Sequence, residues 1–194
     1  AEMLPDDLDC WFDVYAWEPR VTRTGLYRRI DDSHAARSLE SAFSDDGAMT
    51  ELVDLPAVFG GALDLLGYEV FTPSGSAGGE IRLLTVWEVR NPTSMQPADP
   101  ADVGGEPVIF VHALDEEGNL VAQEDRLDAP AWAWQPGDGV AQVHRLSLPS
   151  ESSGEPLALV VGVYRRGDGT RLPVSVEGEV VGDLLFLSAV DVTG

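Results

Sequence analysis

Lysine is missing from this chain. All twelve basic residues are arginine, they stand against 34 acidic residues, and the formal net charge at pH 7 is −22. Proteins that bind nucleic acid or anionic membrane surfaces carry a basic footprint. The composition therefore argues against a nucleic-acid partner, and it leaves the oligomeric state open.

Long apolar runs are also missing. Hydrophobic residues make up 44% of the 194-residue chain, which is ordinary for a soluble globular protein, but no run approaches the roughly 18 residues that a membrane helix needs. We therefore expect no direct membrane insertion of this segment. No charged and then apolar signal segment opens the chain, so we expect any signal or membrane anchor to lie outside these residues.

Cysteine occurs once, at Cys10. A single cysteine forms neither an intrachain disulfide nor a zinc site. The residues before it, Asp7-Leu8-Asp9, are a poor match for the small residues that lipid-anchor processing prefers. We expect no metal and no cofactor.

The acidic excess has three interpretations: adaptation to high salt, the codon usage of a high-GC genome, or a demand for calcium. Under the first, added salt should relieve self-repulsion among the acids. The midpoint of thermal unfolding should then rise as NaCl shortens the Debye length from roughly 30 Å to about 3 Å. A scan of unfolding temperature against NaCl concentration checks this, and a flat or falling midpoint favours codon usage.

The chain from residue 51 to residue 194 has the pattern of an all-β protein. Residues Glu80 to Arg90 alternate, with Ile81, Leu83, Thr85, Trp87 and Val89 on one face, as a strand requires. Leu84 and Val86 interrupt the polar face, which indicates a strand centre covered on both sides. Short strands at near-regular spacing with turn residues between them predict an antiparallel two-sheet β-sandwich, immunoglobulin-like or jelly-roll-like.

Residues 1–50 are expected to form a separate N-terminal extension or linker. Cys10 to Trp17 is rich in aromatic residues and predicts a strand that ends before Pro19. Asp31-Asp32-Ser33 offers a helix N-cap, and an apolar stripe follows at helical spacing. The stripe consists of Ala35, Leu39, Ala42 and Phe43.

Four sequence blocks carry a resemblance to a known family. They are the stretches Phe59 to Tyr68, Val108 to Arg126, Trp134 to Asp138, and Gly162 to Val174. In this order and spacing they resemble the C-terminal extracytoplasmic β-sandwich domain of multi-pass bacterial glycosyltransferases of the protein mannosyltransferase-like class. The resemblance implies a sandwich fold, an extracytoplasmic location, either periplasmic or at the cell surface, and a tether through a membrane segment outside this chain. It implies no catalysis, because the catalytic residues of those enzymes lie in their membrane portion.

Residues suited to catalysis are few. The chain has three histidines, His34, His112 and His144, and no G-x-S-x-G nucleophile motif. For His112 and His144 we expect either a hydrogen-bonded polar pair at a sheet edge or separately buried side chains, and both stay candidates for ligand contact. Carboxylate pairs suited to glycoside hydrolysis arise by chance among so many acids. We therefore assign no catalytic residue and expect no enzymatic activity of this chain.

Oxygen-rich turns are the remaining candidates for a metal site. Asp115, Glu117, Asn119 and Asp168 could supply calcium ligands, but their spacing is not that of an EF-hand loop. Asp, Asn and Gly also suit tight hairpin turns, and we favour that interpretation.

Two tryptophans are candidate ligand-binding residues. Trp132 and Trp134 lie in a loop between Pro130 and Pro136, where they could stack on a sugar ring. The alternative for Trp134 is that it anchors the loop to the core. Trp132 is freer, and we expect it on any ligand surface. Trp87 is expected to be the buried sandwich tryptophan.

The resemblance implies a non-catalytic extracytoplasmic accessory domain associated with a membrane glycosyltransferase or a cell-surface glycan system. Its expected partner is a glycan or a membrane protein. A free-standing carbohydrate-binding module and an uncharacterised enzyme are the alternatives.

Overall fold

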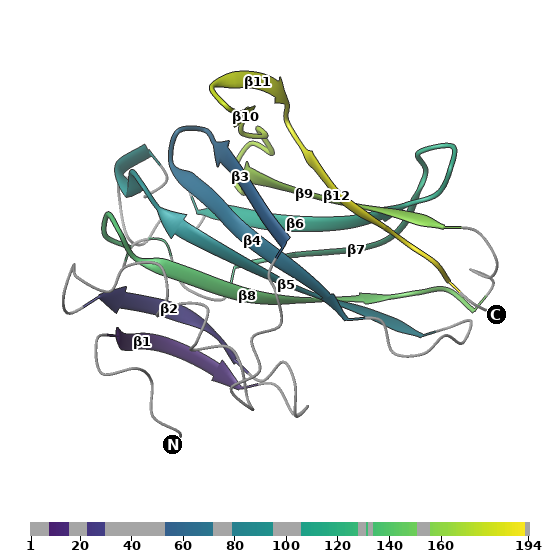
Figure 1. The fold of residues 1–194 in the computed structure, drawn as a ribbon, viewed down its shortest axis with the longest axis horizontal. Coiled ribbons are helices and arrows are strands. Elements are labelled where there is room, and N and C mark those ends of the chain that lie inside the picture. Colours follow the sequence, from purple (N-terminus) through teal and green to yellow (C-terminus); the bar gives the residue numbers. More distant parts are fainter. Residues whose placement is uncertain are drawn as a thin grey trace.

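The structure is a computed structural model that describes residues 8–15, 23–29, 53–71, 79–94, 106–127, 131, 134–150 and 156–192. Two sheets, all of whose strand pairs are antiparallel, pack face to face. Figure 1 shows the two sheets as stacked layers, with β10 and β11 at one end. The predicted all-β two-sheet sandwich is confirmed.

The large sheet has eight strands in the order β1-β2-β8-β5-β4-β3-β10-β11. These are β1 (Leu8–Tyr15), β2 (Arg23–Arg29), β3 (Val53–Phe59), β4 (Leu63–Phe71), β5 (Glu80–Val89), β8 (Gly139–Ser147), β10 (Val174–Val176) and β11 (Glu179–Gly182). The small sheet has four strands in the order β12-β9-β6-β7. These are β6 (Pro107–Leu114), β7 (Leu120–Arg126), β9 (Leu157–Arg165) and β12 (Leu185–Val190). A short 3-10 helix, Pro92–Ser94, follows β5. Within the described residues, no helix is both long and apolar enough to cross a membrane.

The alternation of β5 fixes which of its side chains enter the core. The five residues predicted on one face are all buried, and Trp87 lies fully inside with its ring edge-on to Phe59, 5.0 Å between centroids. Leu84 and Val86, on the opposite face, are buried as well. Both expectations for β5, a buried Trp87 and a centre covered on both sides, are confirmed.

Two of the quoted sequence blocks form tight turns for identifiable reasons. Gly60 and Gly61 both have positive φ, 58° and 67°, and Ala62 N–H donates to the Phe59 carbonyl, which closes a tight turn in the three-residue loop between β3 and β4. In the second block, Pro136 precedes Gly137, whose φ is 86°, and Asp138 N–H donates to the Gln135 carbonyl. Proline followed by a positive-φ glycine is the combination of a type II turn.

Strands within residues 1–50 continue the large sheet. β2 pairs with β8 through Gly25↔Ala141, Leu26↔Val140 and Tyr27↔Gly139, and β1 pairs with β2. The strand predicted from Cys10 is thus present as β1, shifted by two residues toward the N-terminus. The predicted helix lies outside the described residues.

The β10–β11 hairpin contains a backbone position under strain. Glu177 has φ of 51° and precedes Gly178 with φ of 87°. Both central residues of this hairpin loop are therefore left-handed, which Asn tolerates better than Glu.

We expect Glu177→Asn to stabilise the protein by roughly 1 kcal/mol, because the left-handed conformation costs an ordinary residue about that much. Chemical denaturation measures the change. Glu179→Asn is the matched control, since it removes the same charge from the adjoining strand. Equal stability of the two variants would contradict a conformational origin.

Candidate functional site

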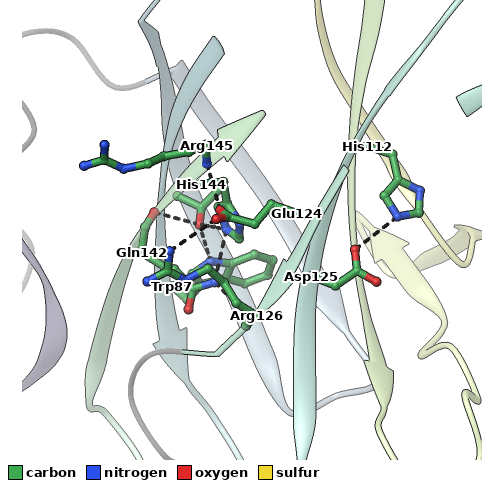
Figure 2. A network of polar contacts seen from close by, with 9 residues as sticks. Trp87, His112, Glu124, Asp125, Arg126, Gln142, His144 and Arg145 are labelled. Atoms are coloured by element: carbon green, nitrogen blue, oxygen red, sulfur yellow. Dashed lines mark hydrogen bonds and ion pairs between the residues drawn. The ribbon is translucent and has the colours of Figure 1, made fainter. Parts of the chain in front are cut away.

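Polar side chains converge between the two sheets where β5 and β8 of the large sheet face β7 of the small sheet. We call this set the inter-sheet network. It consists of Thr85, Trp87, Glu124, Arg126, Gln142 and His144 (Figure 2). Thr85, Trp87, Gln142 and His144 point inward because Thr85 pairs with Gln142, and Leu83 with His144, in the register of β5 and β8.

Hydrogen bonds link the buried members of the network. Trp87 Nε1–H donates to Thr85 Oγ1 at 2.9 Å, and Thr85 Oγ1 lies 3.4 Å from both the Gln142 carbonyl and His144 Nε2. Gln142 Nε2 donates to the Arg126 carbonyl across the sandwich at 3.0 Å. The network therefore ties the large sheet to β7.

The tautomer of His144 follows from its neighbours. Gln142 Nε2, which can only donate, lies 3.3 Å from His144 Nε2. Nε2 therefore accepts, and the imidazole proton resides on Nδ1. That nitrogen lies 3.6 Å from Glu124 Oε2, which is longer than a hydrogen bond.

Both carboxylate oxygens of Glu124 already interact with other groups. Arg145 N–H donates to Oε2 at 2.7 Å, and Arg126 Nη1 lies 3.2 Å from Oε1. Burial lowers the pKa of His144 to about 3, and the nearby Arg126 guanidinium adds to this shift. Although the Glu124 carboxylate lies close, the cost of placing a charge in this dry site decides the outcome. His144 is neutral at physiological pH.

The geometry of the network suits a structural role. His144 has no exposed surface, so an imidazole that would act as a general base has no access to substrate or water. Across the residues that the structure describes, no group of three or more His, Cys, Asp or Glu side chains is placed to hold a metal ion.

A second set of residues lies on the opposite side of the small sheet, which we call the outer face. Glu124 and Asp125 are neighbours on β7, but they point to opposite sides of the strand, Glu124 toward His144 and Asp125 toward His112 (Figure 2). The strand registers align one row across all four strands. The row runs Gln123, His112, Val160, Phe186.

His112 is the titratable centre of this face. Its Nε2 lies 3.3 Å from Asp125 Oδ1, and Tyr164 O–H donates to Asp125 Oδ2 at 3.3 Å. Burial lowers the pKa of His112, although the Asp125 carboxylate opposes the shift. Burial is also the main cause of the raised pKa of Tyr164. At neutral pH the outer face thus presents a neutral imidazole and phenol around one carboxylate.

Phe110 lies flat beneath this surface because Gly162, its partner on β9, has no side chain. A Cβ atom added at Gly162 would lie 2.1 Å from Phe110 Cζ, so any larger residue would force the Phe110 ring to move. The Arg171 guanidinium covers the ring at 4.9 Å from its centroid, and His112 packs beside it at 4.6 Å between ring centroids. Such contacts hold the guanidinium over the face of the sheet.

Phe186, at the end of the row, is 55% exposed. Its backbone partner Val160 is buried and faces the same side. The outer face therefore combines an exposed aromatic ring with hydrogen-bonding groups of both polarities on a rigid sheet. This combination can hold a sugar ring or another flat polar ligand.

Three of the candidate calcium ligands, Asp115, Asn119 and Asp168, form hydrogen bonds within hairpin turns. Asp115 accepts from Asn119 N–H at 2.7 Å and from Asn119 Nδ2 at 2.9 Å, and Asp168 accepts from Thr170 N–H at 2.9 Å. The Asn119 side-chain hydrogen bond lowers the pKa of Asp115, and the Thr170 backbone hydrogen bond lowers that of Asp168. These carboxylates fix hairpin geometry.

The structure separates the predicted ligand-binding residues. His112 lies on the outer face and His144 inside the sandwich, so they do not form a pair at a sheet edge. Trp134 is buried in the core, and its expected alternative role as an anchor of the loop is confirmed. Trp132 lies outside the described residues. Ligand contact by these four residues stays a prediction.

Sequence reasoning missed Glu124, Asp125 and Phe186. The available signal was the alternation of Ala122, Glu124 and Arg126 against Gln123 and Asp125, which assigns successive acids to opposite faces of β7.

Comparison with known proteins adds no relative: no family model and no curated protein matches the sequence, and no solved structure matches the fold.

Proposed function

We propose that this chain is a non-catalytic accessory domain of an extracytoplasmic glycan system, and that it binds glycan on the outer face of the small sheet. The observation that carries this proposal is a contrast in exposure. His144 is sealed between the sheets, whereas Phe186 is 55% exposed at the end of the outer-face row that also contains His112. A membrane glycosyltransferase is the parent or neighbour that the resemblance implies.

The chemistry of the face favours a neutral glycan. Asp125 and Asp183 are carboxylates at or beside this surface, and Asp183 lies 3.8 Å from Arg171. A carboxylate accepts hydrogen bonds from sugar hydroxyls but repels uronic acids and sulfated sugars. The net charge of −22 adds to that repulsion.

We expect Phe186→Ala to weaken binding of neutral mannose, glucose or galactose oligosaccharides about tenfold. Losing one aromatic contact removes roughly 1.4 kcal/mol, and that amount corresponds to a factor of ten in affinity. Isothermal titration calorimetry across this panel measures the change. Leu120→Ala is the control, because Leu120 is also half-exposed but lies at the hairpin between β6 and β7.

Two results would count against the proposal. One is that no oligosaccharide of the panel binds at millimolar concentration. The other is binding that Phe186→Ala leaves unchanged. Turnover of nitrophenyl glycosides by this chain, lost on substitution of Asp125, would instead support the enzyme alternative.

A further inference from the structure

The large sheet ends in β1 at one edge and in β11 at the other. β11 pairs with β10 on one side, and within the described part of the chain no strand lies on its other side. Figure 1 shows β11 at the end of the sheet, beyond β10. All four of its residues are exposed, so one row of its backbone donors and acceptors faces solvent.

The side chains of β11 are unusual for an exposed edge. Val180 is 69% exposed and Val181 is 55% exposed, and Val180 is the most exposed large hydrophobic residue in the described part of the chain. Natural edges are commonly protected by charged side chains, lysine above all, or by proline. Glu179 is the one charged residue of β11. The chain has no lysine, and β11 has no proline. An edge with free backbone groups and branched apolar side chains is where an extended peptide adds as a further strand.

The charges beside β11 select what can occupy the edge. Glu177 and Glu179, at the start of β11, make no ion pair among the described residues. Asp183, which follows the end of β11, lies 3.8 Å from Arg171. A second copy pairing through β11 would bring acids against acids on a protein of net charge −22. An incoming strand with basic residues at its ends places opposite charges there.

We propose that β11 accepts an extended segment of a partner polypeptide, in which Arg or Lys flanks branched apolar residues, as an added strand. The segment pairs with the free backbone of Glu179–Gly182, and its apolar side chains lie beside Val180 on one face and Val181 on the other. One of its basic ends lies near Glu177 and Glu179, and the other lies near Asp183. This site goes beyond the glycan surface, because it is on the other sheet and recognises a polypeptide.

The probe is a synthetic peptide of alternating valine and threonine with two arginines at each end, acetylated and amidated. A second peptide of the same length carries glutamate in place of arginine. Amide chemical shifts and amide exchange rates of the full chain are measured by NMR during each titration. The arginine peptide should shift the amides of Val180, Val181 and Gly182 saturably and slow their exchange, and the glutamate peptide should not.

Substitutions localise the effect. Val180→Lys places a protective charge on the edge and should weaken binding of the arginine peptide at least about tenfold. Leu120→Lys makes the same charge change at another exposed apolar side chain and should leave binding unchanged. Glu179→Gln keeps both valines and should reduce only the salt-dependent part of the affinity. The dispersion of each spectrum reports whether the variant folds.

Three outcomes would overturn the proposal: no shift with millimolar arginine peptide, shifts confined to the small sheet, or equal binding by Val180→Lys and Leu120→Lys. Shifts at β11 that grow with protein concentration when no peptide is present would assign the edge to a second copy. Glycan titration reports on Phe186 and His112 rather than on β11, so this proposal and the glycan proposal can each fail alone.

Discussion

Trp87→Ala should lower the free energy of unfolding by roughly 3–5 kcal/mol, as removal of a fully buried large aromatic side chain does. The substitution removes the edge-on contact with Phe59 and leaves a cavity between the sheets. It also takes away the indole N–H that donates to Thr85 Oγ1 at 2.9 Å. Equilibrium denaturation in urea measures the loss.

Two further variants separate the contribution of the buried ring from that of the indole N–H. Trp87→Phe keeps most of the volume and loses the N–H, so it should cost roughly 1–3 kcal/mol, the penalty for a buried polar atom that loses its partner. Phe186→Ala removes an aromatic ring that is half in solvent, and its effect should stay within about 0.5 kcal/mol. A loss below about 1 kcal/mol for Trp87→Ala would contradict the position of this residue at the centre of the core.

Acid should weaken the fold through His144. The folded-state pKa of about 3 lies below the ordinary value of 6.5. Above pH 6.5 the imidazole is neutral in both states, and its contribution to stability is complete. As the pH falls below 6.5, only the unfolded chain takes up the proton, so the free energy of unfolding should fall by roughly 1.4 kcal/mol per pH unit, with the full contribution lost near pH 3.

The comparison with His144→Gln isolates this contribution, because the two proteins share every carboxyl group. Between pH 6 and pH 4 the free energy of unfolding of the variant should depend less steeply on pH. The difference in slope should correspond to about one proton fewer taken up on unfolding. His112→Gln is the control and should change the slope less, since Asp125 partly offsets the desolvation of His112. Parallel stability profiles for the original chain and His144→Gln would show that His144 titrates normally.

Alternation and turn chemistry were sufficient to predict the central strands. The strand predicted from Glu80 to Arg90 is present as β5, which ends one residue earlier at Val89, because its apolar residues alternate over the whole length. The hairpin of β10 and β11 was missed for two reasons. Its loop is Glu177-Gly178, where Asn-Gly or Asp-Gly is the recognisable signal, and the valines of β11 are exposed, so no burial pattern marks the strand.

The candidate sites were less predictable, because they depend on contacts between strands that are distant in sequence. Glu124 meets His144 only because β7 packs across the sandwich from β8. The row from Gln123 to Phe186 requires the register of three strand pairs. Sequence identified both His112 and His144 as candidates, but it could not place His112 on the outer face of the small sheet and His144 in the large sheet, between the two sheets.

The central claim is that the buried polar groups serve the fold and that ligand binding belongs to the outer face. The most direct measurement is the long-range proton–nitrogen NMR spectrum of the histidine side chains while a neutral oligosaccharide is added, with signals assigned by single substitutions. The account predicts that the His112 signals move saturably and that His144 stays fixed, neutral and protonated on Nδ1. Movement of the His144 signals with those of His112 unchanged, or a charged His144 at neutral pH, would contradict it.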